Sequence, residues 1–154
     1  MRLYRLAAAR YASTLWSGQG GLLGPARWHS RPRLVVYAAG SLALAQLEKL
    51  AQYRDRSQIP GQVVGWLDVP DVVRPDVVDA AVLPKHWRQP SPLPRATQAL
   101  GDDWIERGGS LLLRVPSALS PSDFNYLLNP GNADLAKCKK SVPAPFAFDP
   151  RLAR

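Results

Sequence analysis

The sequence predicts a single α/β (α+β) domain with a central mixed sheet, spanning residues 1–154. Apolar runs rich in β-branched and aromatic residues alternate with two stretches of helical periodicity, which favours strands and helices packed around one sheet. A length of 154 residues suits one domain with a sizeable core. The apolar content of 46% and charged content of 21% are typical of a globular protein rather than a disordered chain.

The first third of the chain predicts two strands separated by a loop. Residues 2–7, "RLYRLA", alternate well enough for a short strand. Residues 17–26, "SGQGGLLGPA", are rich in glycine and predict a loop. Residues 33–39, "RLVVYAA", are apolar on both alternating faces, which is typical of a buried strand.

A helix is predicted directly after the second strand. Gly40 and Ser41 end the strand, and Ser41 is a suitable N-cap. Glu48 is expected at the edge of the apolar face, one turn after Leu44. The residues expected to form that face are Ala43, Leu47, Leu50 and Ala51.

The rest of the chain predicts one more helix and further extended segments. The helix covers residues 96–107, with Thr97, Leu100 and Trp104 on one face and Gly108 as its stop. A proline-rich connection with little regular structure precedes it. The extended segments are strands over 61–69 and 110–115, a short strand or turn over 124–130, and a tail over 143–154, and the connection covers 70–94.

The net charge of +8 is concentrated near the N-terminus. Residues 1–50 carry seven arginines and lysines against a single acid, Glu48. Such an excess predicts a positive field that attracts an anion, whether a phosphorylated small molecule, a nucleic acid or an acidic protein.

Several function classes find no support in the sequence. A lone cysteine, Cys138, excludes an internal disulfide and favours a reducing compartment such as the cytoplasm. His29 and His86 lack metal-ligand spacing, so no metal is expected. No apolar run reaches the length of a membrane span. The chain also lacks helix-turn-helix and RNP motifs, so direct nucleic-acid binding is not expected, and it lacks GxSxG and P-loop signatures.

Four polar residues stand out, although each has an ordinary structural explanation when taken singly. Taken alone, Glu48 is compatible with a solvated position on a helix, and Arg27 is compatible with an ordinary exposed arginine. Tyr37 follows two valines in a buried strand and fits a core position. Ser117 fits a turn or cap after Pro116.

Taken together, the segments that hold these residues resemble the RES domain family, the toxin halves of bacterial toxin–antitoxin pairs. The similarity covers essentially the whole chain, with the motifs in the family's order. The segments are "ARWHS", "VVYAAGSLALAQLEKL", "LPKHWR", "TQALGDDWIERGGSLLLRVPSALSPSDFNYLLNP" and "FAFDPRL".

The resemblance implies a fold similar to that of ADP-ribosyltransferases and a defined set of site residues. It puts the family's arginine on Arg27, its glutamate on Glu48 and its serine on Ser117, all three expected to be catalytic. It also puts a pocket tyrosine on Tyr37. The expected substrate-binding residues are Arg27, Tyr37, Ser117 and Asn125.

The resemblance also implies an activity and partners. NAD is expected as a substrate that is cleaved at the nicotinamide–ribose bond, with inorganic phosphate or water as acceptor and with no bound cofactor. Depletion of NAD would then arrest growth. The expected partner is a helix-turn-helix (Xre-type) antitoxin whose C-terminal part covers the pocket, and a homodimer within that complex is compatible with the family. A protein ADP-ribosyltransferase of the same fold, or a non-catalytic antitoxin-binding domain, stays open.

The residue types suit this chemistry. Cleavage of the bond develops an oxocarbenium-like ribose, which a carboxylate such as Glu48 stabilises. The guanidinium of Arg27 suits phosphate oxygens, and Tyr37 can stack on a ring or form a hydrogen bond through its hydroxyl. Ser117, at the end of a strand, can orient ribose or nicotinamide. Nicotinamide leaves from a cationic ring nitrogen, so its departure needs no general acid.

The sequence departs from the family pattern at three places. Pro25 and Ala26 stand where glycine usually precedes the "RW" arginine. Residues 29–33, "HSRPR", replace a segment that usually contains glycine, and Asn132 replaces a usual histidine. These changes concern the loops around the expected site rather than the four expected pocket positions.

Overall fold

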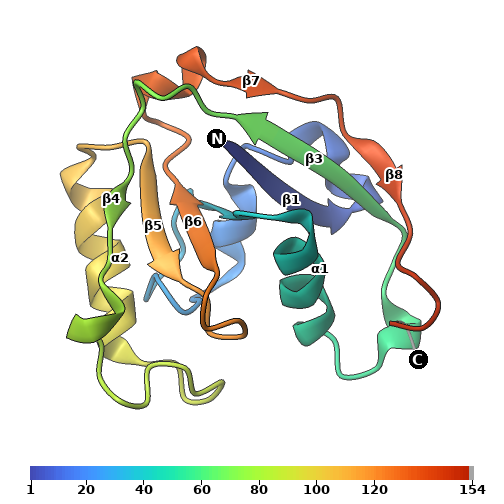
Figure 1. The fold of residues 1–154 in the computed structure, drawn as a ribbon, viewed down its shortest axis with the longest axis horizontal. Coiled ribbons are helices and arrows are strands. Elements are labelled where there is room, and N and C mark those ends of the chain that lie inside the picture. The colour runs from blue at the N-terminus through green and yellow to red at the C-terminus, as the bar shows by residue number, and fades with distance from the viewer. Residues whose placement is uncertain (153–154) are drawn as a thin grey trace.

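The computed structural model describes residues 1–152 as a curled mixed sheet flanked by two α-helices (Figure 1). The strand order is β4-β5-β6-β2-β1-β3-β7, and β8 also pairs with β3. The strands β4 and β5 are parallel, and the other pairs are antiparallel, so the predicted mixed sheet is confirmed. The strands are β1 (Arg2–Ala8), β2 (Val36–Ala39), β3 (Gln62–Asp68), β4 (Asp76–Val77), β5 (Leu112–Pro116), β6 (Phe124–Leu128), β7 (Lys139–Lys140) and β8 (Ala144–Phe146).

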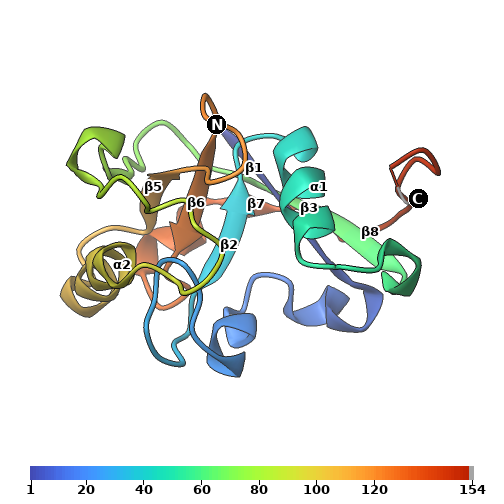
Figure 2. The same cartoon turned by 90° about the horizontal axis from the view of Figure 1, so that it is seen from below.

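The helices are α1 (Leu42–Ala51) and α2 (Arg95–Arg107). Figure 2 shows them well separated, with α2 at the end of the sheet that holds β5 and α1 over the half that holds β1 and β3. No helix within residues 1–152 is both long enough and apolar enough to cross a membrane. Short 3₁₀ helices cover Ala9–Thr14, Gln19–Leu23, Arg56–Gln58, Ala80–Val82 and Ala133–Lys137.

The two halves of the sheet meet at the pair β1–β2. Strands β1 and β3 stay in register from Arg2 opposite Asp68 to Ala8 opposite Gln62. Within the described residues, β1 and β2 pair at one register position, Tyr4 opposite Ala39. The strands therefore diverge beyond this position, and the sheet opens between them.

Helix α1 begins as predicted but buries a different face. The Oγ of Ser41 accepts a hydrogen bond from the backbone N–H of Leu44 at 3.1 Å, which confirms the predicted N-cap. The predicted face is wrong in part, since Leu50 is buried while Leu47 is 42% exposed. Leucines occur on several sides of this helix, so only its packing against the sheet selects the buried side, which consists of Leu44, Ala45 and Leu50.

Helix α2 ends as predicted, at Gly108, whose φ of 62° is left-handed. Of its predicted face, Thr97 and Trp104 are buried, but Leu100 is half-exposed and Gly101 takes its place in the contact. A Cβ added to Gly101 would lie 1.8 Å from the carbonyl oxygen of Trp28. The missing side chain thus lets the "ARWH" segment pack directly on the helix.

The loops differ from the sequence expectation in two places. The predicted loop 17–26 contains the 3₁₀ helix Gln19–Leu23. Gly21 of this helix lies against the carbonyl of Arg33, where a Cβ would come within 2.3 Å. The predicted tail includes β8, and the rings of Phe146 and Phe148 pack against the cluster under α1. Residues 153–154 of that tail lie outside the described residues. The connection 70–94 holds only β4 and one 3₁₀ turn, as predicted.

We expect Gly101→Ala to lower the free energy of unfolding by about 2–3 kcal/mol, because the new methyl group displaces the Trp28 backbone. This loss should appear although alanine favours a helix interior by about 1 kcal/mol. Urea unfolding followed by tryptophan fluorescence measures it. Gly109→Ala is the matched control, since a Cβ there meets open space and should change stability by less than about 0.5 kcal/mol. Equal stability of the two variants would contradict the close approach.

Candidate active site

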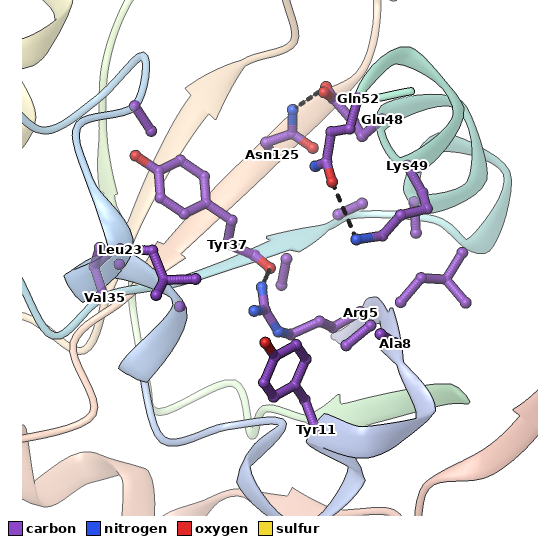
Figure 3. A pocket seen from close by; sticks show the side chains of 18 of the residues that line it. Arg5, Ala8, Tyr11, Leu23, Val35, Tyr37, Glu48, Lys49, Gln52 and Asn125 are labelled. Atoms are coloured by element: carbon purple, nitrogen blue, oxygen red, sulfur yellow. Dashed lines mark hydrogen bonds between the residues drawn. The ribbon is translucent and has the colours of Figure 1, made fainter. Parts of the chain in front are cut away.

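A cavity of about 630 Å³ opens where β1 and β2 diverge. Figure 3 shows its wall, to which α1, β1, β2, β6 and the glycine-rich segment contribute side chains. The Nη1 of Arg5 donates a hydrogen bond to the carbonyl of Tyr37 at 2.6 Å, which joins the two diverging strands at the floor of the cavity. The polar residues on this wall include Arg5, Tyr37, Glu48, Lys49, Gln52 and Asn125.

The carboxylate of Glu48 is held by two side chains from distant parts of the sequence. Its Oε1 accepts a hydrogen bond from the Nδ2 of Asn125 at 2.5 Å and another from the Oγ of Ser117 at 3.1 Å. Asn125 lies on β6, and Ser117 follows β5 directly. The structure therefore brings together three of the five residues expected from the sequence, and it fixes the carboxylate at the cavity wall.

Ser117 lies behind the carboxylate rather than on the cavity wall. It is fully buried, and its Oγ also accepts hydrogen bonds from the backbone N–H groups of Leu119 and Ser120, both at 3.1 Å. The Ser117 hydroxyl therefore stabilises the turn, as the sequence suggested, and also contacts Glu48. An orienting role of Ser117 toward ribose stays a prediction.

Tyr37 lies on β2 and contributes to the cavity wall. Its hydroxyl forms a hydrogen bond on the side of the ring that lies away from Glu48. Figure 3 shows the hydroxyl pointing away from Glu48 and Asn125. It lies 2.7 Å from the Nδ1 of His29, whose Nε2 lies 2.9 Å from the carbonyl oxygen of Gly24. Burial raises the pKa of the Tyr37 phenol, so the hydroxyl keeps its proton.

His29 has two hydrogen-bond partners that the sequence did not predict. Its bonds to Tyr37 and Gly24 depend on the "ARWHS" segment folding back over β2. No spacing in the sequence signals that fold. Its place two residues after Arg27 was the only available hint.

Arg27 lies near Glu48, and the connection between β4 and α2 holds its side chain. Its Nη1 donates hydrogen bonds to the carbonyls of Trp87 and Gln89, the second at 3.1 Å. Burial lowers the pKa of the Arg27 guanidinium, and the charge of Glu48 acts in the opposite direction. Arg27 is thus close enough to act on Glu48 electrostatically, and its contact with phosphate stays a prediction.

Three cations that the sequence did not mark as site residues line the cavity, namely Arg5, Arg10 and Lys49. Burial lowers the pKa of Arg5 to about 10. Burial and, secondarily, the positive charge of Arg5 lower the pKa of Lys49 to about 8. The Nζ of Lys49 donates a hydrogen bond to the Oε1 of Gln52 at 3.1 Å. The anion-attracting field predicted from composition is therefore present at this wall, and the only sequence signal for these residues was the charge excess.

The loop that departs from the family pattern is fixed to α2 by ion pairs. The Nε of Arg33 lies 3.0 Å from Asp102, and Arg31 and Arg33 both contact Glu106. Although burial acts to raise it, the pKa of Asp102 is lowered by hydrogen bonds from Ser30 and by the charge of Arg33. These contacts hold the "ARWHS" segment beside the cavity without the usual glycine.

Asn132 also has a structural role where it replaces the usual histidine. Its Oδ1 accepts a hydrogen bond from the backbone N–H of Asp134 at 2.9 Å and caps the 3₁₀ helix Ala133–Lys137. Asn132 therefore stabilises the turn in which it lies. Within residues 1–152, no group of three or more His, Cys, Asp or Glu side chains is arranged to hold a metal ion.

The fold and this site define a domain with a curled mixed sheet and a carboxylate set into a cationic cavity. The same fold occurs in a chain of the crystal structure of the M. tuberculosis MbcT–MbcA toxin–antitoxin complex. The TM-score is 0.76 at 16% identity, over 99% of this chain and 86% of that chain. The predicted fold class is confirmed by this likeness.

The RES domain family model matches residues 2–149, and the chain belongs to this family. It is 36% identical to "Toxin Res" of Yersinia enterocolitica over 153 residues, which is 99% of each chain. It is also 36% identical to "Toxin Res" of Photorhabdus laumondii, over 100% of this chain and 98% of the relative. A third relative, the "Prs ADP-ribosylating toxin" of a Sphingobium species, is 30% identical over 149 residues, covering 96% of this chain and 92% of its own length.

We expect Lys49 to titrate near pH 8, well below an ordinary lysine, because its ammonium group is partly desolvated beside Arg5. Reductive ¹³C-methylation of the lysines, followed by an NMR pH titration, measures this value. Lys49→Arg removes the signal and so assigns it. A titration without any lysine signal that moves below about pH 9.5 would contradict the placement of Lys49 at this wall.

Proposed function

We propose that this protein is the toxin of a type II toxin–antitoxin pair and an enzyme that degrades NAD by cleaving the nicotinamide–ribose bond. The observation that carries the proposal is the Glu48 carboxylate, fixed by Asn125 and Ser117 at the wall of a cationic cavity. Membership in the RES domain family and the full-length similarity to toxins support it.

The role of Glu48 follows from the charge that develops during cleavage. As nicotinamide leaves, positive charge builds on the ribose, and a carboxylate fixed beforehand stabilises that charge without reorganising. The hydrogen bonds from Asn125 and Ser117 both reach Oε1, so they set the direction of the carboxylate. Hydrogen bonding between such a carboxylate and the ribose 2-OH would strengthen in the transition state.

Arg5 and Lys49 suit the pyrophosphate of NAD. Both line the same cavity as Glu48, and burial in a site of lower dielectric strengthens their attraction for an anion. Such cations also suit inorganic phosphate as the acceptor of the ADP-ribosyl group. Water is the other acceptor that the site admits.

The proposed partner is a helix-turn-helix antitoxin that covers the cavity. Leu23 lines the cavity and is 83% exposed, and the neighbouring Leu22 is 47% exposed. Apolar side chains that face solvent beside a charged site suit a surface that a partner covers. The similar fold in a toxin–antitoxin complex supports this part of the proposal.

A second candidate is transfer of ADP-ribose to a protein. The relative from Sphingobium is named an ADP-ribosylating toxin, and both reactions pass through the same bond cleavage.

The experiment that tests the proposal incubates the purified chain with NAD labelled in its adenine ring, with and without phosphate and with a cell lysate. A phosphorylated ADP-ribose supports phosphorolysis, free ADP-ribose supports hydrolysis, and labelled protein supports transfer. Intact NAD under all three conditions would overturn the enzyme proposal and favour a non-catalytic, antitoxin-binding domain.

We expect Glu48→Gln to lower NAD consumption about 100-fold or more, because the amide no longer stabilises the developing positive charge. Chromatography of the nucleotide products measures this loss, and growth after induction shows whether the arrest is relieved. Asp103→Asn is the matched control, since Asp103 is an exposed acid of α2 whose ion pair is with Arg107 of the same helix. Full NAD consumption by Glu48→Gln would contradict the role of this carboxylate.

We expect the apparent KM for NAD to rise as the pH increases through about 8, because Lys49 then loses the charge that attracts the pyrophosphate. Initial rates between pH 6.5 and 9.5 measure this dependence. Lys49→Arg should remove the rise, since guanidinium stays charged throughout that range. A rise of equal size in the Lys49→Arg variant would mean that another group titrates.

A further inference from the structure

We infer that His29 is a positioning residue, which fixes the ring of Tyr37 against the cavity, so that Tyr37 meets the substrate with its aromatic face and not with its hydroxyl. This inference rests on the proposed function for its kinetic consequences, whereas the arrangement of His29 and Tyr37 can be tested without any activity. It decides between the two roles, stacking and hydrogen bonding, that the sequence leaves open for Tyr37.

The partners of the imidazole assign its tautomer. The carbonyl oxygen of Gly24 can only accept, so the Nε2 of His29, 2.9 Å away, carries the hydrogen. Because Nε2 carries the hydrogen of a neutral imidazole, Nδ1 is left with a lone pair. The hydroxyl of Tyr37, 2.7 Å from Nδ1, therefore donates its hydrogen to that nitrogen.

The surroundings of the Tyr37 hydroxyl agree with this direction. Burial, the larger effect, raises the pKa of Tyr37, while the nearby Trp28 backbone acts to lower it. The phenol therefore keeps its hydrogen, which it can donate to His29. Since His29 is only 1% exposed, these bonds lie on the side of the ring away from the solvent.

His29 is itself held rigidly, which lets it fix a neighbour. Its backbone pairs with Ala26 in an isolated bridge, and the side chain of Gln98 on α2 donates to the carbonyls of both Ala26 and His29. The imidazole and phenol rings lie 5.7 Å apart between centroids, at 45°. A ring fixed in this way loses little freedom when a planar group stacks on it, so more of the contact contributes to binding.

The face of Tyr37 that remains available belongs to the wall that Glu48 and Asn125 share. The hydroxyl points away from both (Figure 3). A planar ring bound beside the Glu48 carboxylate would therefore meet the phenol face. In the proposed reaction, that ring is the nicotinamide of NAD.

Nitrogen NMR tests the tautomer directly. The chain holds only two histidines, and His86 is exposed, so His86→Gln leaves the signal of His29 alone. We expect ¹⁵N correlations of the Nε2–H form for His29. In the chain that keeps His86, Tyr37→Phe should shift the Nδ1 signal of His29 and leave the His86 signal unchanged. An Nδ1–H form, or a His29 signal that does not respond to Tyr37→Phe, would overturn the inference even if the protein consumes NAD.

A double-mutant cycle tests the consequence. We expect Tyr37→Phe and His29→Leu each to raise the KM for NAD about 3–10-fold, the range for loss of one hydrogen bond, with kcat changed less than about twofold. The double variant should be no worse than the poorer single variant, because His29 acts through Tyr37. His29→Asn, which keeps an acceptor near the Nδ1 position, should recover most of the loss.

Three results would overturn the inference. The first is a large loss of kcat in Tyr37→Phe at unchanged KM, because the hydroxyl would then act in catalysis. The second is a double variant in which the two single effects multiply. The third is a His29→Asn variant as poor as His29→Leu. If His29→Leu does not fold, Tyr37→Phe and the NMR measurement still decide, and a wild-type chain that leaves NAD intact would refute the proposed function instead.

Discussion

The site depends on the narrow join between two halves of one sheet. Strands β1 and β2 pair at Tyr4 and Ala39 and then diverge, and the guanidinium of Arg5 reaches across to the carbonyl of Tyr37. A sheet that stayed paired along its whole length would leave no cavity at this place. Because Arg5 is partly buried at the split, the side chain that joins the strands is also one of those that make the cavity attractive to anions.

The second constraint is the way in which three segments converge on Glu48. Helix α1 brings the carboxylate, β6 brings Asn125, and the turn after β5 brings Ser117. Each of these contacts spans about seventy residues of sequence or more, so the site exists only when the whole sheet is assembled. The tail contributes as well, since Phe146 and Phe148 pack beside Leu44 and Ala45 of the helix that carries Glu48.

The sequence predicted the elements more successfully than their faces. The Ser41 cap and the Gly108 stop depend on local chemistry, and the structure confirms them. The strands predicted over 33–39 and 110–115 are also present, but they cover only Val36–Ala39 and Leu112–Pro116. The buried sides of α1 and α2 were partly wrong, because leucines lie on several sides of α1 and because a glycine forms the closest contact of α2. A pattern of apolar residues cannot signal a contact that consists of a missing side chain.

The sequence by itself determined the family, the local elements and the excess of positive charge, because each depends only on the order and type of the residues. The residues expected around Glu48 followed from that resemblance, and two of them, Ser117 and Asn125, bind its carboxylate. Only the tertiary structure decided that Arg5 and Lys49 face the cavity and that His29 binds Tyr37. The physical reason is that these arrangements depend on where a sheet opens and how a loop folds back, which are properties of packing between distant segments.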